Sequence, residues 1–70
     1  MTLRECLLER TEADRYVKIY VGGWLTGMCY IDYEDLFIVS LNSNFLRREV
    51  KGIELVYDED FVRMIYRVDV

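Results

Sequence analysis

The sequence contains no histidine and no proline, and it has only two cysteines and four glycines among its 70 residues. Without histidine, the chain lacks the usual general base at neutral pH and the commonest metal ligand of proteins. Without proline, every residue can donate a backbone hydrogen bond to a helix or a sheet. Cys6 and Cys29 show neither a CxxC motif nor a metal-ligand spacing, so we interpret them as free buried thiols. These absences predict a protein that is not an enzyme and holds no metal and no cofactor.

Basic residues are also few, because nine lysines and arginines stand against thirteen acidic residues, which gives a net charge of -4. Non-specific binding to nucleic acid or to an anionic membrane requires the opposite balance, so we expect neither. No apolar run reaches the length of a transmembrane helix. The first ten residues include Arg4, Glu5, Glu9 and Arg10 instead of the apolar stretch of a signal peptide. The sequence therefore predicts a cytoplasmic protein.

Apolar residues make up 53% of the chain and aromatic residues 14%, which is too much for a disordered segment. We expect one domain spanning residues 1–70, close to the size at which a single core is barely sufficient. Such a chain has more apolar surface than one small copy can bury. The composition alone therefore favours a binding partner.

A short helix is predicted at the N-terminus. Thr2 and Glu5 have the spacing of a capping box, in which each side chain bonds the backbone of the other. Leu3, Cys6 and Leu7 follow the i, i+3, i+4 spacing of an apolar stripe. We expect a helix from Leu3 to Arg10 that packs on a sheet, since two turns do not persist alone.

A hairpin is predicted next, because strand formers at Tyr16–Val21 and Trp24–Ile31 flank the pair Gly22-Gly23. A two-residue turn places Val21 opposite Trp24, and strict alternation then puts Met28 and Tyr30 on the face of Val17 and Ile19. Gly27 in mid-strand suggests a bulge or a bend. Both faces of this hairpin are apolar, so we expect self-association into a homodimer or a higher homo-oligomer. The residues predicted to form that contact are Tyr16, Tyr20, Trp24 and Leu25.

Three further strands are predicted in the rest of the chain. Residues 36–41 form an apolar third strand, and residues 45–49 are either a helical turn, capped by Ser43 or Asn44, or an ordered loop. Val50–Tyr57 and Phe61–Val70 form a second hairpin with a loop of two or four residues. The predicted fold is α+β, with the short N-terminal helix packed on a bent five-stranded antiparallel sheet. An open meander and a closed SH3-like or Sm-like barrel both fit this pattern.

Acidic residues gather in two predicted turns that would lie at the same end of that sheet. We interpret them as an acidic rim that binds a protein partner with a basic surface, such as the nucleic-acid groove of another protein. The alternative is that these residues only favour turns and keep the sheet edges soluble. The rim comprises Asp32, Glu34, Asp35, Asp58, Glu59 and Asp60.

Two resemblances to known families add expectations. The order of features resembles the Sm-like barrels: a strand at Val17–Val21, the glycine pair, a second strand and then Ile31-Asp32. This resemblance implies an oligomeric barrel that binds RNA or a small nucleotide. Segments Thr2–Leu7, Val17–Tyr20 and Phe45–Ile53 resemble small uncharacterised proteins of phages and mobile elements in Firmicutes. The second resemblance implies a phage accessory or anti-defence inhibitor, of the anti-CRISPR kind, that works by binding a host protein such as a CRISPR nuclease complex.

Overall fold

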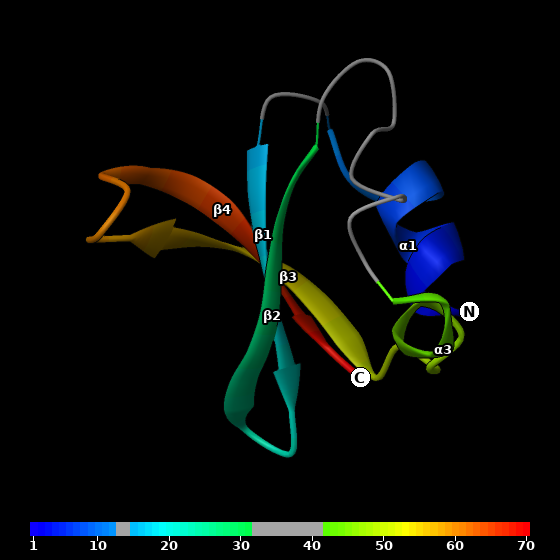
Figure 1. Ribbon diagram of the computed structural model, residues 1–70. Coiled ribbons are helices and arrows are strands. Elements are labelled where there is room, and N and C mark those ends of the chain that lie inside the picture. The colour runs from blue at the N-terminus through cyan, green and yellow to red at the C-terminus, as the bar shows by residue number, and fades with distance from the viewer. Residues whose placement is uncertain (13–14, 32–41) are drawn as a thin grey trace.

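The computed structural model describes residues 1–12, 15–31 and 42–70. In this part of the chain, two short helices and four strands form one α+β unit (Figure 1). The strands belong to a single open sheet with the order β2-β1-β4-β3. The elements are α1 (Leu3–Glu9), β1 (Arg15–Val21), β2 (Trp24–Ile31), α3 (Ser43–Leu46), β3 (Gly52–Asp58) and β4 (Arg63–Asp69).

Helix α1 confirms the prediction made from its capping box. The Glu5 backbone N–H donates to Thr2 Oγ1 over 3.3 Å, and the Thr2 backbone N–H donates to Glu5 Oε1 over 3.1 Å. The bond from the Thr2 backbone N–H, together with one from the Thr2 hydroxyl to Glu5 Oε1 over 3.0 Å, lowers the pKa of the Glu5 carboxyl, because both favour its charged form. The stripe of Leu3, Cys6 and Leu7 is buried, so the helix packs on the sheet as expected.

The first hairpin has the predicted turn, with Gly22 at φ +58° and Gly23 at φ +86° and with Val21 opposite Trp24. Its register then shifts at a bulge between Ile19 and Tyr20. One extra residue on β2 moves every later side chain to the other face of the sheet.

The predicted faces of β2 were therefore wrong beyond the bulge. Val17 lies opposite Cys29, and Lys18 lies opposite Met28. Met28 consequently shares a face with Lys18. Cys29, and not Met28, shares the face of Val17 and is buried under the helix.

The predicted five-stranded antiparallel sheet is wrong, and the described strands form neither the meander nor the closed barrel. Strand β4 lies parallel to β1, with Val17 opposite Tyr66 and Ile19 opposite Val68, so the sheet is mixed. Strand β4 takes this inner position because Tyr66 and Val68 extend the apolar surface that α1 covers. Strands β2 and β3 form the two edges of the described sheet, which leaves it open. The predicted third strand, residues 36–41, lies outside the described residues.

The second hairpin confirms the four-residue option for its loop. Asp58 lies opposite Arg63, and the loop consists of residues 59–62. Leu55 lies opposite Tyr66 and Tyr57 opposite Met64, so these apolar side chains share one face, as alternation predicts.

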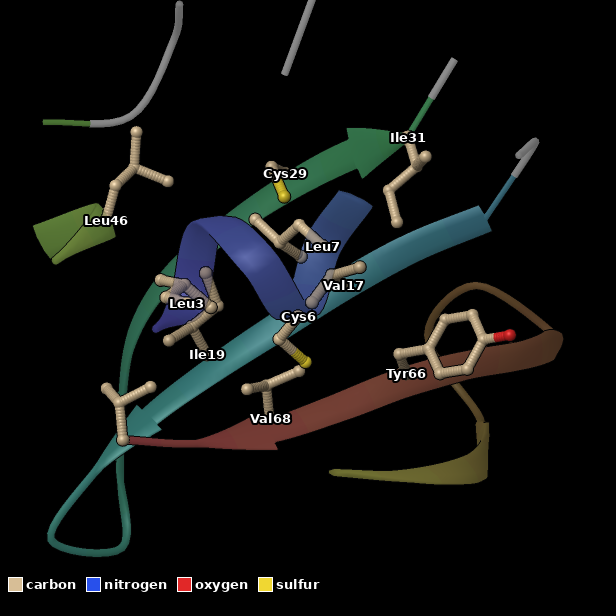
Figure 2. Packing of buried hydrophobic residues seen from close by; sticks show 11 residues of the cluster. Leu3, Cys6, Leu7, Val17, Ile19, Cys29, Ile31, Leu46, Tyr66 and Val68 are labelled. Carbon is tan, nitrogen blue, oxygen red and sulfur yellow. The ribbon is translucent and has the colours of Figure 1, made fainter. Parts of the chain in front are cut away.

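The core lies between one face of the sheet and the helices. Figure 2 shows Leu3, Cys6 and Leu7 of α1 lying over Val17 and Ile19 of β1. The buried residues of this core are Leu3, Cys6, Leu7, Val17, Ile19, Cys29, Ile31, Leu46, Tyr66, Val68 and Val70.

Helix α3 confirms the helical turn over the ordered loop, but the turn begins at Ser43 and ends at Leu46 instead of covering residues 45–49. The predicted cap, Ser43 or Asn44, is also wrong, because the Asn42 side chain caps the turn by accepting from the Asn44 backbone N–H over 2.8 Å. Phe45 packs on the core, and a Cβ atom added to Gly27 would lie only 2.9 Å from its ring. Gly27 therefore serves the close approach of α3 to β2.

Among residues 1–12, 15–31 and 42–70, no helix has the length and the hydropathy needed to cross a membrane.

Candidate functional site

The tip of the β3–β4 hairpin is held by one carboxylate. Asp58 Oδ1 accepts from the backbone N–H groups of Asp60, over 2.9 Å, and of Phe61, over 3.1 Å. Asp58 Oδ2 lies 2.5 Å from Lys18 Nζ on β1, and both side chains are largely buried. The hydrogen bond between them lowers the pKa of Asp58 and raises that of Lys18. Asp58 therefore anchors the hairpin, and little of its charge faces solvent.

Phe61 folds from the tip onto the sheet face that the helices leave uncovered. Its ring stacks on Tyr16 with the two centroids 4.3 Å apart and the planes 5° apart. Lys18 Nζ lies 5.5 Å from the same ring. Ile65, whose side chain is on this face, is buried. The tip thus forms a small second cluster that fixes its position on the sheet.

Val62 completes the loop with a φ of +53°, the left-handed region that β-branched residues rarely adopt. Its side chain is 72% exposed, so it contributes little to the core. The contacts of Asp58 and Phe61 on either side of the turn hold the backbone in this conformation. The loop therefore presents a strained, exposed apolar residue to solvent.

The remaining carboxylates of the tip point outward. Glu59 is exposed, and the Asp60 side chain is 88% exposed, with Oδ2 3.8 Å from Lys18 Nζ. We call Glu59 and Asp60 the acidic tip. Of the predicted acidic rim, Asp58 is used inside the fold, while Asp32, Glu34 and Asp35 lie outside the described residues.

An apolar strip lies on β3 and on the facing residue Met64 of β4, and we call Leu55, Tyr57 and Met64 the β3 strip. Tyr57 is 58% exposed and Leu55 is 46% exposed, although both are on the face that forms the core elsewhere. The hairpin end of β3 and β4 extends away from α1 and α3, so the helices do not cover it (Figure 1). The sequence predicted this shared face but gave no sign that the helix stops short of it.

The residues predicted to drive self-association fall into two groups. Trp24 is 80% exposed, and Leu25 is also exposed. Tyr16 stacks on Phe61, and the Tyr20 ring lies 4.1 Å from the Arg67 guanidinium. Tyr16 and Tyr20 therefore make contacts within the chain, while the other two face solvent from the edge strand β2.

The two thiols are poorly suited to nucleophilic chemistry. Burial raises the pKa of Cys29 to about 11 and also raises that of Cys6. A thiolate, not a thiol, is the nucleophile and metal ligand. Within the described ranges, no group of three cysteine or acidic residues is placed to hold a metal ion.

Comparisons of the chain with protein-family models, curated proteins and solved structures find no match.

Proposed function

We propose that this chain is a non-enzymatic binding protein that docks its β3 strip and acidic tip onto another protein. The observation that carries the proposal is that one hairpin exposes an apolar strip, Leu55, Tyr57 and Met64, on one face of the sheet and two carboxylates, Glu59 and Asp60, at its tip. Contiguous apolar side chains rimmed by polar ones are typical of protein interaction sites.

The three kinds of residue contribute differently to such an interface. Tyr57 offers a rigid amphipathic ring, which is the type of side chain enriched among binding hot spots. Glu59 and Asp60 speed association with a positively charged surface and set its orientation. The Lys18–Asp58 ion pair holds the loop in place before binding, so less ordering entropy is lost on docking.

The partner that fits is a protein with an apolar groove bordered by lysine or arginine. A nucleic-acid groove has this charge, and an acidic protein bound there would block it. The resemblance to phage accessory proteins suggests a CRISPR nuclease complex of the host cytoplasm as the first partner to examine. The function proposed is therefore inhibition by occupation of a basic surface.

The alternative of an RNA- or nucleotide-binding Sm-like protein rested on a closed barrel. The open sheet removes that support. Carboxylates at the exposed hairpin end also repel phosphate.

The first experiment is calorimetric titration of a purified CRISPR nuclease complex with four forms of the chain. These are the wild type, Tyr57→Ala, the double variant Glu59→Gln/Asp60→Asn, and Met28→Lys as a control on the far edge of the sheet. Loss of a hot-spot side chain costs about 2 kcal/mol, so Tyr57→Ala should weaken binding about 30-fold. The double variant should bind more weakly at low salt and lose much of the salt dependence of its affinity, while the control should bind as the wild type does.

If that nuclease does not bind, the same four proteins are immobilised and exposed to a lysate of the native host. A captured protein supports the proposal only if Tyr57→Ala loses it and Met28→Lys retains it. If no protein shows this pattern, or if the hairpin variants bind as tightly as the wild type, the proposal is wrong.

A further inference from the structure

The two edges of the described sheet differ in how they are protected against pairing with another chain. Strand β3 carries Glu54 and Asp58 and follows Lys51, and charges of this kind discourage edge-to-edge contact. Strand β2 has no charged residue and no proline in its eight residues, Trp24–Ile31. Its bulge lies near the turn, so residues 27–31 form a regular, uncharged edge. This is the kind of edge that pairs.

Apolar side chains along β2 also face solvent, although the Tyr30 ring lies 4.9 Å from the Tyr16 ring of β1. Trp24 and Leu25 are exposed near the turn, Met28 is 50% exposed, and Tyr30 is partly exposed. We call these four residues and the backbone of β2 the β2 edge. Leu25, Met28 and Tyr30 share one face, while Trp24 lies on the other with Val21. An occupant of this edge would therefore contact apolar side chains above and below the sheet.

We propose that the β2 edge pairs with the β2 edge of a second copy of this chain, in antiparallel orientation about a two-fold axis. Pairing of an edge with itself closes the assembly at two copies, because each chain then has no equivalent edge left. The product is one sheet with the order β3-β4-β1-β2-β2-β1-β4-β3. The proposal does not depend on the function of the acidic tip.

Charge limits the surfaces through which two copies can meet. The chain carries a net charge of -4, so two copies repel each other over most of their surface. The β2 edge is neutral, and Lys18 on the adjacent strand is already paired with Asp58. A two-fold axis also reverses strand direction, which sends the two acidic tips to opposite ends of the joint sheet. Among the described residues, contact through β2 thus brings few like charges together.

The available area sets the strength of this contact. With large side chains offering about 150–250 Å² each, the exposed parts of the four residues amount to roughly 500 Å² per copy. Two copies then bury at most about 1,000 Å², the lower limit of specific interfaces. The structure therefore points to a weak dimer whose population rises with protein concentration.

The test is sedimentation equilibrium of the wild type, Met28→Lys and Leu55→Lys over a wide concentration range. Both substitutions replace a half-exposed apolar residue on an edge strand, so they match in chemistry and differ in edge. The wild type and Leu55→Lys should pass from 8.4 kDa to twice that mass, while Met28→Lys should remain at 8.4 kDa with an unchanged circular dichroism spectrum. Amide exchange in residues 27–31 should slow as the wild type is concentrated.

A wild type that stays at 8.4 kDa up to its solubility limit overturns the proposal. A Met28→Lys variant that dimerises as the wild type does also overturns it. The same holds if the rate of amide exchange in residues 27–31 does not change with protein concentration. Species larger than a dimer overturn the closed two-fold arrangement. Failure of this proposal shows in the mass of the wild type and of Met28→Lys. Failure of the proposed function shows instead in the binding of the hairpin variants, such as Tyr57→Ala.

Discussion

Val62 gives the sharpest test of the described geometry, because it is a β-branched residue at φ +53° with most of its side chain in solvent. The left-handed conformation costs about 1–2 kcal/mol in an L-residue with a Cβ atom. Asparagine tolerates this conformation better than other non-glycine residues. The small buried part of the Val62 side chain contributes roughly 0.5 kcal/mol, which its replacement loses. We therefore expect Val62→Asn to raise the free energy of unfolding by about 0.5–1 kcal/mol.

Glycine should help less at this position. It removes the same strain, but it adds about 0.5–1 kcal/mol of conformational entropy to be lost on folding, so Val62→Gly should be close to neutral. Val62→Thr is the matched control, since threonine keeps the β-branch and the strain while adding a hydroxyl. The expected order of stability is Asn, then Gly, then Thr and Val together.

Thermal and urea unfolding measure this series. In a domain of this size, 1 kcal/mol shifts the midpoint by about 4–8 °C, so the effect of asparagine is within easy reach. If Val62→Thr stabilises as much as Val62→Asn, the gain comes from polarity and not from the backbone. If asparagine and glycine both destabilise, the reasoning about strain is wrong.

Three further predictions concern other parts of the fold. Gly27→Val should lose about 1–3 kcal/mol of stability in urea unfolding, because its Cβ would meet the Phe45 ring. Gly52→Val is the control, since a Cβ there meets nothing within 4 Å, and its stability should change little. Equal losses in the two variants would contradict the packing of Phe45 on Gly27. The pKa of Asp58 is lowered, so the stability of its ion pair is present above pH 3.8, its ordinary pKa, and is lost as the pH falls through the folded value. Melting temperatures of the wild type and Asp58→Asn should therefore converge in acid, and a constant difference would refute the pairing. Cys29 should react with iodoacetamide at neutral pH only as fast as the protein unfolds, since burial raises its pKa to about 11, and fast labelling of the folded protein would refute its burial.

The parts of the fold that the sequence predicted correctly rest on local signals. Thr2 and Glu5 stand three residues apart and bond each other directly, and Gly22-Gly23 takes the positive φ angles that a two-residue hairpin turn requires. In each case the residues that carry the signal are also the residues that make the contact. Distant parts of the chain do not alter such a result.

The errors arose where contacts between distant segments decide the outcome. The alternation of Tyr66 and Val68 is the same whether β4 pairs with β1 or with a strand elsewhere, so periodicity could not reveal the parallel pairing. Gly27 marked an irregular point in β2, but the ring that requires a glycine there, Phe45, comes from another element. The bulge beside it reversed the faces of the strand beyond, and no single-sequence pattern gives the direction of such a shift.

The candidate site shows the same division. Sequence reasoning found the cluster Asp58, Glu59 and Asp60 from composition alone, but it assigned all three the same role. The structure separates them, because Lys18 comes across the sheet to pair with Asp58 and leaves the other two exposed. The β3 strip was visible as a face of alternating apolar residues, and its exposure depends on how far α1 reaches over the sheet.

The two proposals together fix the stoichiometry of a complex. In an antiparallel dimer joined through β2, the acidic tips lie at opposite ends and on the outermost hairpins, so one compact partner cannot contact both. Titration of the dimeric chain with its partner should therefore saturate at two partners for two copies, each with the same affinity as the Met28→Lys monomer. Binding of a single partner per dimer, with an affinity gained from both tips, would contradict this arrangement, because the tips would have to lie side by side. Mass measurement of the saturated complex decides between the two, and the equal affinity of the monomer shows that the hairpin alone is the binding unit.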